Sequence, residues 1–430
     1  MVATRRPPGR KAQILGVAGE RFHRDGYHRV SMAELAGELG ITAPALYRHV
    51  PGKPELLRQV LDSHLRALRE AVRAGSSTPN EADGPNGPSE ASEPAGPSAL
   101  AAALAPAAID HRALGTLWQR DARLLPPAQR ALLRRELRAE VAAMATTLRR
   151  SRPELTIPDA ELLCWSALSA LGGLSNHSFV LPRRRFERLL GELTTAVLST
   201  PLPSSPSGPC SVAADGPPPP GSRREELLTA AVVLFHRYGF DNVTTDRLGA
   251  AVGIAGPSVY KHFGTKAELL AAALERCRER LRQEVSAPMA AAGGPAVALA
   301  AGLGAYVDFA RRHGDHLGAM VSETERLAAA DRRAAVAFRR EFLRTWVELL
   351  RRVRPQYGPA EARIRVHAMF ALVNDGVRGG WARPDLTQCL TDLAAAVSGL
   401  TALDMEQGRA RPGPPLRGHH DEVGQYSTNG

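Results

Sequence analysis

Apolar residues recur along most of this chain at the three- and four-residue spacing of amphipathic helices. Two clear stretches lie in 132–144 and 336–350, and their periodic apolar positions are Leu132, Leu133, Leu137, Val141, Met144, Val336, Phe338, Phe342, Trp346, Leu349 and Leu350. No alternating apolar and polar run of strand length stands out between such stretches. The pattern therefore predicts an all-α protein.

Three polar segments rich in Pro, Gly and Ser break this pattern, and they hold much of the chain's 39 glycines and 33 prolines. We expect flexible linkers and a tail there, because such segments bury too little apolar surface to fold. The resulting boundaries are 1–73, 74–98 (linker), 99–200, 201–221 (linker), 222–284, 285–404 and 405–430 (tail).

The chain also repeats itself. The segment Phe22–Gly26 (FHRDG) returns as Phe235–Gly239 (FHRYG), at an offset of 213 residues, and 15 of the 36 positions from Phe22 to Leu57 are identical at that offset. In the second halves, Arg152 matches Arg354 at a shorter offset of 202. We infer two tandem copies of one unit, with the first linker largely an insertion.

Each copy opens with the pattern of a helix-turn-helix. A first helix is predicted at 10–24, and Ser31 and Glu34 have the spacing of a capping box, which starts a second helix. Gly40 ends that helix, and Thr42 can cap a third short helix at 43–49. Two short helices joined by a tight Gly-containing turn form a helix-turn-helix.

The chemistry of the third helix favours DNA. Its first residues are small, so its backbone can approach base edges closely, and later residues supply donors for phosphate oxygens. A lysine that begins the next helix opposes the helix dipole, which a bound phosphate would relieve. The residues expected at the DNA are Ser31, Thr42, Ala43, Pro44, Ala45, Tyr47, Arg48, His49 and Lys53.

The second copy keeps this pattern with two changes. Arg247 stands where the capping box needs a carboxylate, and Ala255 replaces the Thr42 cap, at a cost of about 1 kcal/mol to the third helix. We therefore expect this copy to bind DNA more weakly or to read other bases. Its expected DNA-facing residues are Thr244, Gly256, Pro257, Ser258, Tyr260, Lys261, His262 and Lys266, with the third helix at 256–262.

Charge supports a polyanionic partner. The chain holds 55 Lys and Arg against 44 Asp and Glu, a net charge of +11. Residues 1–69 carry 12 basic and 6 acidic residues, whereas 70–100 carry 1 and 5, and 222–282 carry 10 and 7. Positive charge is thus concentrated where the first helix-turn-helix lies.

Other roles for four of these residues stay open. Tyr47 and Tyr260 can instead pack the third helix onto its neighbours, and His49 and His262 can instead cap its C-terminal end. The linkers can be spacers without any other function.

The sequence resembles the N-terminal DNA-binding domain of TetR/AcrR transcriptional regulators. The resemblance rests on Ser31–Ala36 (SMAELA), Gly40–Val50 (GITAPALYRHV) and Lys53–Leu57, matched in the second copy by Thr244–Phe263 and Lys266–Leu270. It implies two tandem units, each a three-helix helix-turn-helix DNA-binding head followed by a helical ligand and dimerisation domain. It also implies a ligand-responsive repressor of double-stranded operator DNA, usually a homodimer with one unit per chain.

Residues 99–200 and 285–404 would then be the effector domains. Long apolar helices at 158–178 and 359–379, each followed by another after Pro182 or Pro384, would form a four-helix interface within one chain or between two chains. Core packing competes with ligand contact at every aromatic candidate, and we expect an apolar or amphipathic ligand. The candidates are Trp118, Trp165, His177, Tyr306, Trp346, His367 and Phe370.

Other classes of protein find little support. No nucleotide-binding, zinc-protease or hydrolase motif is present, so we expect neither an enzyme nor a cofactor, and His419 and His420 are a chance pair rather than a metal site. Four scattered cysteines favour a reducing compartment, and the uncharged run 285–307 is broken by Gly and Pro. We expect a cytoplasmic protein without a signal peptide. A helical scaffold that binds no DNA, or one reading head with an inert partner, remains the alternative.

Overall fold

The computed structural model describes residues 9–77, 96–203 and 222–409, and within these ranges the secondary structure is helical with no strand. We call residues 9–203 unit one and residues 222–409 unit two. Each unit has a small head, residues 9–73 in unit one and 222–284 in unit two. The remainder of each unit is its body. The two linkers and the tail lie largely or wholly outside the described residues. His419, His420 and Cys210 are outside them as well.

Unit one contains nine α-helices and four short helical turns within the described residues. They are α1 (Arg10–Asp25), η1 (Tyr27–Arg29), α2 (Met32–Glu38), α3 (Ala43–His49), α4 (Lys53–Ser76), α5 (Pro97–Asp110), α6 (Leu114–Thr116), η3 (Leu117–Asp121), η4 (Ala122–Leu124), α7 (Pro127–Ser151), α8 (Ile157–Gly172), η5 (Gly173–Asn176) and α9 (Arg183–Ser199).

Unit two repeats this order and adds a helix at its end. Its elements are α10 (Arg223–Tyr238), η6 (Phe240–Asn242), α11 (Thr245–Ala251), α12 (Gly256–Val259), α13 (Lys266–Leu281), η7 (Arg282–Ser286), α14 (Ala287–Ala290), α15 (Pro295–Arg312), α16 (Gly314–Ser322), η8 (Thr324–Arg326), α17 (Ala329–Val353), α18 (Pro359–Arg378), α19 (Leu386–Ser398) and α20 (Ala402–Arg409).

The bodies correspond residue by residue at the offset of 202. The helices α7 and α17 start at Pro127 and Ala329 and have the same length of 25 residues. The equivalent helices α5 and α15 are each followed by a C-cap histidine, His111 and His313, whose N–H donates to the carbonyl four residues earlier. We therefore call two body residues 202 positions apart counterparts.

Several helix ends differ from the sequence-based boundaries. The helix α4 continues through Gly75 to Ser76. A glycine is required at position 75, because a Cβ atom there would lie 2.9 Å from the Leu100 Cα atom of α5. The helix α5 starts at Pro97, which suits a first-turn position. Both residues had been expected in the linker. The third helix of unit two was predicted to reach residue 262, but α12 ends at Val259.

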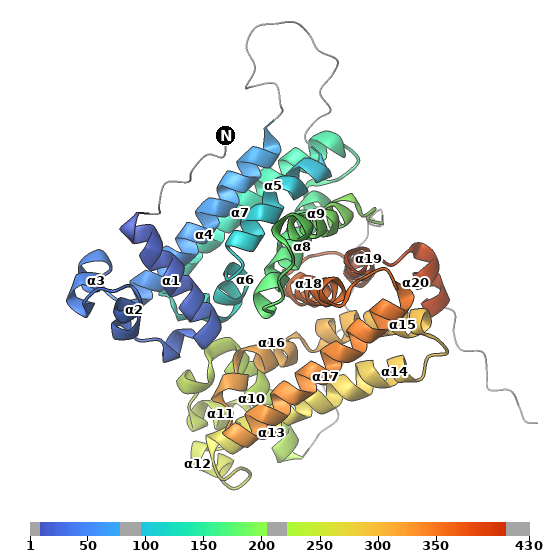
Figure 1. The fold of residues 1–430 in the computed structure, drawn as a ribbon. Helices are drawn as coiled ribbons and strands as arrows, with labels where there is room; N and C mark the ends of the chain where they lie inside the picture. The colour runs from blue at the N-terminus through green and yellow to red at the C-terminus, as the bar shows by residue number, and fades with distance from the viewer. Residues whose placement is uncertain (1–8, 78–95, 204–221, 410–430) are drawn as a thin grey trace, which may run out of the picture.

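The two units pack against each other through their bodies (Figure 1). The helices α8 and α9 of unit one lie against α18 and α19 of unit two, as the four-helix interface predicts. One hydrophobic core runs from head one through both bodies, whereas the head of unit two has a core of its own that includes Ala319 and Leu327 of body two. The interface is therefore formed inside one chain.

Polar contacts also join the units. Arg123 of unit one donates to the Glu323 carboxylate at 3.0 Å and to the His236 carbonyl of head two at 3.2 Å. Gln119 donates to both carboxylate oxygens of Asp375 at 3.1 Å, and Arg383 pairs with Asp159. These contacts place head two against both bodies.

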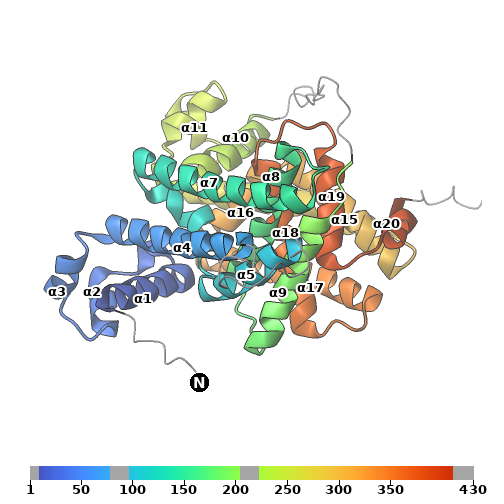
Figure 2. The same ribbon diagram turned by 90° about the horizontal axis from the view of Figure 1, so that it is seen from above.

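The two heads lie away from the interface between the bodies. In Figure 1, α3 is at the left edge and α12 at the lower edge of the molecule, and the interface between the bodies is to the right of both. Seen from above in Figure 2, α3 lies at the outer tip of head one, at the far end of α4 from α9. The arrangement leaves the outer face of α3 clear of the rest of the described chain.

None of the described helices combines the length and apolar character needed to cross a membrane, which agrees with the broken run at 285–307. That run is divided among η7, α14 and α15. Three cysteines, Cys164, Cys277 and Cys389, are buried as free thiols. Burial raises the pKa of each of these thiols to about 12, so they are packed as small apolar groups.

Candidate nucleic-acid interface and ligand cavity

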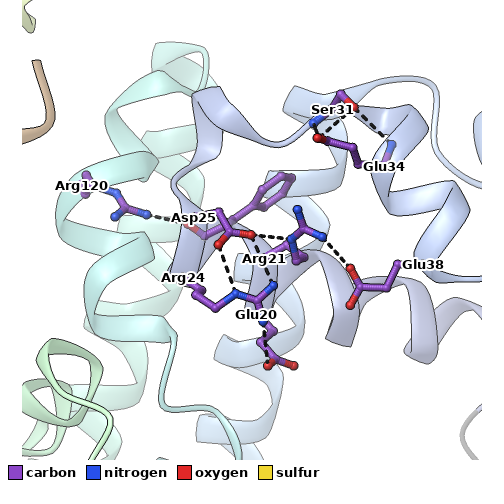
Figure 3. Close-up of polar contacts among 9 residues, drawn as sticks. Glu20, Arg21, Arg24, Asp25, Ser31, Glu34, Glu38 and Arg120 are labelled. Atoms are coloured by element: carbon purple, nitrogen blue, oxygen red, sulfur yellow. Dashed lines mark hydrogen bonds and ion pairs between the residues drawn. The ribbon is translucent and has the colours of Figure 1, made fainter.

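A complete capping box starts α2 in head one (Figure 3). The Ser31 hydroxyl accepts from the Glu34 N–H at 3.1 Å, and the Glu34 carboxylate accepts from the Ser31 N–H at 2.7 Å. The bond from the Ser31 N–H, followed by one from the Ser31 hydroxyl, lowers the pKa of Glu34. The turn after α2 contains Gly40 at φ +64°, a left-handed conformation that favours glycine. Both features fix the angle between α2 and α3.

The helix α3 presents its predicted residues outward. Thr42 caps it by accepting from the Ala45 N–H at 3.4 Å, and Pro44 lies in its first turn. Leu46 is fully buried, whereas Tyr47 is 49% exposed. The remaining predicted residues on this helix, Ala43, Arg48 and His49, are half-buried in the first case and exposed in the other two. The exposed ring means that Tyr47 is not a core residue.

An ion network holds α1 against α2. Arg21 of α1 binds Asp25 at 2.5 Å and Glu38 of α2 at 2.8 Å, and Arg24 also reaches Asp25 (Figure 3). The hydrogen bond from Arg24, followed by that from Arg21, lowers the pKa of Asp25. The side chains are partly exposed, so solvent screens these pairs and they contribute little to stability. Their use is to orient the helix pair below α3.

Lys53, predicted to hold a phosphate, begins α4 and is half-buried. Its ammonium lies 4.4 Å from the centre of the Tyr27 ring, and burial lowers the pKa of Lys53. A cation over an aromatic face is stabilised by the ring. Lys53 therefore packs η1 onto α4 in this structure.

Head two has a weaker third helix, as its sequence indicates. Thr244 caps α11 by accepting from the Arg247 N–H at 3.2 Å, but no side chain caps α12, which begins after Ala255. Gly256 is buried against α11. It packs so closely that a Cβ atom at this position would lie 2.9 Å from the Asp246 Cα atom. Gly256 was predicted to face DNA, and it packs inside the head instead.

The other predicted residues of head two divide into exposed and engaged groups. Pro257, Tyr260, Lys261 and His262 are exposed, with Tyr260 at 52%, and Ser258 is half-buried. Lys266 donates to the Phe240 and Val243 carbonyls at 2.9 and 3.0 Å. Its ammonium is thus already engaged within the head.

Head one is tied to its body by contacts that the sequence did not indicate. Arg120 of η3 donates to the Phe22 carbonyl at the end of α1, at 2.6 Å (Figure 3). The His23 ring bonds the Ser175 carbonyl of η5 at 2.6 Å, and burial lowers the pKa of His23. No local pattern could reveal these pairs, because the partners are about 100 and 150 residues apart.

A cavity of about 840 Å³ lies in unit one, between α4, α5, α7 and α8. Trp118 and Trp165, both predicted ligand residues, line it. Unit two completes its wall with Trp381, Arg378 and neighbouring residues that follow or end α18. The size falls in the range of small-molecule sites in proteins.

The other predicted ligand residues lie elsewhere. His177 and His367 face each other across the two units, with ring centres 4.9 Å apart. Burial lowers the pKa of His177 to about 3 and that of His367 to about 4, so both rings are neutral at pH 7. They are not among the residues that line the cavity.

Tyr306, Trp346 and Phe370 form a packed aromatic cluster with Phe342 inside body two. The Tyr306 hydroxyl donates to Asn374 at 2.8 Å, and Trp346 has no exposed surface. These three predicted ligand residues therefore fill the core of body two, which was the competing interpretation.

Comparison with known proteins finds a match to one family model in each of the two heads. The family model described as bacterial regulatory proteins, tetR family, matches residues 14–60 and 227–273. The HTH-type transcriptional activator FasR of Mycolicibacterium smegmatis is 38% identical over 72 residues, which are 17% of this chain and 33% of that protein. The HTH-type transcriptional regulator TtgR of Pseudomonas putida is 33% identical over 73 residues, 17% of this chain and 34% of that protein. The chain thus spans about a third of these relatives.

Solved structures show a likeness of lower degree. The ketosteroid transcriptional regulator KstR2 of Mycobacterium tuberculosis has a TM-score of 0.37 and 22% identity, covering 42% of this chain and 95% of that one. A TetR-family regulator from Bordetella parapertussis 12822 has a TM-score of 0.37 and 18% identity, covering 41% and 95%. The family model thus matches one segment in the head of each unit.

Proposed function

We propose that the chain is a sequence-specific transcriptional regulator that reads one stretch of double-stranded DNA with two unequal heads. The observation that carries this proposal is an exposed triplet of tyrosine, cation and histidine in each head, at residues 47–49 within α3 and at residues 260–262 directly after α12. Recognition helices of this motif enter the major groove, and their flanks bind phosphates. Because the heads differ, the two half-sites need not form a palindrome.

DNA footprinting of the purified chain, followed by fluorescence anisotropy at several salt concentrations, tests this function. We expect Arg48→Ala and Lys261→Ala each to weaken binding and to lower the salt slope by about one, since each removes a phosphate contact. Arg351→Ala, an exposed arginine near the end of α17, is the matched control and should change neither value. Absent or salt-insensitive DNA binding would support a helical scaffold instead.

A second arrangement has one observation in its favour. The helix α12 is four residues long and has no side-chain cap, whereas α3 has seven residues and the Thr42 cap. Head two would then be only a structural partner of head one. In that case Lys261→Ala leaves affinity unchanged and the footprint covers a single half-site.

We further propose that the chain acts as an intramolecular pseudo-dimer, a cytoplasmic ligand-responsive repressor without enzymatic activity. The contacts of α8 and α9 with α18 and α19 support the pseudo-dimer. Light scattering after size exclusion should give the monomer mass of 46.0 kDa. Twice that mass in dilute solution would refute the monomeric form. Repression by blocking polymerase is tested by transcription from the footprinted promoter with and without the chain.

A further inference from the structure

The two bodies have the same helices but different interiors. Four positions around the cavity of unit one, Leu104, Glu140, Met144 and Leu168, have aromatic counterparts in unit two. Two of them, Leu104 and Leu168, line the cavity directly. The counterparts, in the same order, are Tyr306, Phe342, Trp346 and Phe370.

The aromatic counterparts occupy the space that is open in unit one. Phe370 lies 4.6 Å from Tyr306, 5.2 Å from Trp346 and 5.7 Å from Phe342, measured between ring centres. These are the distances of aromatic rings in contact. Asn374, which binds the Tyr306 hydroxyl, is the counterpart of the cavity-lining Gly172. Body two is thus filled by its own side chains.

The cavity of unit one has an arginine in its wall without a carboxylate partner among the described residues. The Arg112 guanidinium donates to the Leu174 carbonyl at 2.9 Å and to the His177 carbonyl. Its Nε atom is buried without a partner, and burial lowers the pKa of Arg112. Arg112 is partly buried, and a cation withdrawn from water without an anion is costly, so an anionic ligand would stabilise this wall.

Other charges around the cavity leave a surplus of cations. Arg134 and Arg138 line it and are exposed, so they lie at its rim. Of the two lining carboxylates, Asp375 already binds Arg378 at 2.5 Å, and Glu161 is the other. In unit two the counterpart of Arg112 is Gly314.

We infer that the chain has a single ligand site, the cavity of unit one, and that this site takes an amphipathic molecule with an apolar body and one anionic group held at Arg112. The inference rests on the proposed ligand-responsive function and specifies its site, ligand class and stoichiometry. The Ser166 hydroxyl and the Trp381 indole N–H are buried in the wall without a partner among the described residues.

Three probes that share a 12-carbon chain test the ligand class in the full protein: dodecanoate, 1-dodecanol and dodecyltrimethylammonium. Three of the four tryptophans line the cavity, so intrinsic fluorescence reports binding, and titration calorimetry gives the stoichiometry. We expect one dodecanoate per chain, bound roughly ten- to a hundred-fold more tightly than the alcohol, because a charge-assisted hydrogen bond is lost. Equal or tighter binding of the cation, no binding of any probe, or two dodecanoates per chain would overturn the inference.

Variants exchanged between the units locate the site. Leu168→Phe places the residue of unit two in the cavity and should abolish binding, whereas Phe370→Leu is the matched reverse exchange and should leave the first site intact. Arg112→Met should remove the preference for dodecanoate over dodecanol while keeping the alcohol bound. Unchanged dodecanoate binding by Leu168→Phe, with circular dichroism showing both variants folded, would place the site elsewhere.

Failure of this inference is distinguishable from failure of the proposed function. Without any probe, Leu168→Phe should keep the DNA affinity of the parent chain, because the substitution is remote from α3 and α12. A parent chain that binds dodecanoate but no DNA would refute the regulator and leave the site standing. A chain that binds DNA but no probe would refute the ligand site and leave the DNA-binding regulator standing.

Discussion

The ion pair between Arg123 and Glu323 gives the sharpest test of how the units are joined. The Glu323 side chain is 2% exposed and accepts from Arg123 at 3.0 Å, from the Phe240 N–H at 3.2 Å and from the Ser322 hydroxyl at 2.8 Å. Arg123 is 24% exposed and also donates to two backbone carbonyls. The carboxylate therefore depends on its partner more than the arginine does.

Unequal costs follow from this unequal burial. Arg123→Ala leaves a buried carboxylate with two neutral donors, and breaking a buried pair in this way costs about 3–5 kcal/mol. Glu323→Ala leaves a guanidinium that still reaches solvent and carbonyls, so the loss is that of one charge-assisted hydrogen bond with its supporting bonds, about 1.5–3 kcal/mol. The double variant should cost less than the sum of the two.

Urea denaturation of the parent chain, both single variants and the double variant measures these costs as a double-mutant cycle. Because two folded units unfold here, the first transition is the one compared. Arg344→Ala removes an ion pair to Glu341 in which both side chains are about 60% exposed, and it serves as a control that should stay within about 0.5 kcal/mol. A smaller cost for Arg123→Ala than for Glu323→Ala, or a coupling energy near zero, would refute the reasoning.

Three further outcomes are expected. Ser31→Ala should destabilise head one by about 1 kcal/mol in thermal unfolding, because it removes the capping box; a melting temperature equal to that of the parent would contradict this. Gly173→Val should weaken the contact between units by about 1–3 kcal/mol in urea, since even a Cβ atom would lie 2.8 Å from the His367 carbonyl oxygen; an unchanged midpoint would count against that close approach. Burial, with a smaller effect from His111, lowers the pKa of His64 to about 3, below the ordinary value of 6.5. Below pH 6.5 this histidine is therefore protonated in the unfolded chain but stays neutral in the folded chain. The stability that it contributes is complete above pH 6.5 and is lost as the pH falls toward 3. The loss from His64 between pH 7.5 and 5 is about 2 kcal/mol, and His64→Gln should reduce the measured pH dependence by that amount.

Local sequence signals predicted the parts of the fold that depend on neighbouring residues. The capping box at Ser31, the helix at 43–49 and the lost cap at Ala255 each involve groups within four residues of one another, so residue type and spacing suffice. The repeat predicted the matching interface helices, because a copied sequence folds into a copied structure. These features were all available before any long-range contact was known.

Long-range packing decided the rest. Lys266 was expected at a phosphate, but its ammonium bonds carbonyls 23 and 26 residues earlier, and no motif encodes such a contact. Trp381 completes the cavity of unit one from the other unit, and no local sequence pattern indicates which unit's cavity a residue will line. The sequence around an aromatic residue such as Trp346 does not distinguish a side chain that lines a cavity from one that fills the core. Only the neighbouring volumes distinguish the two.

The interface formed within one polypeptide changes how the regulator would respond to its own abundance. Separate chains must first meet, so the fraction in dimers falls on dilution and the amount of dimer varies as the square of a low chain concentration. Here α8 and α9 reach α18 and α19 without a second molecule, and the joined heads keep a fixed effective concentration. Promoter occupancy would then rise in simple proportion to the number of chains. In a cell with very few copies, every chain would still have its two heads joined, whereas a dimer of separate chains would largely dissociate into monomers.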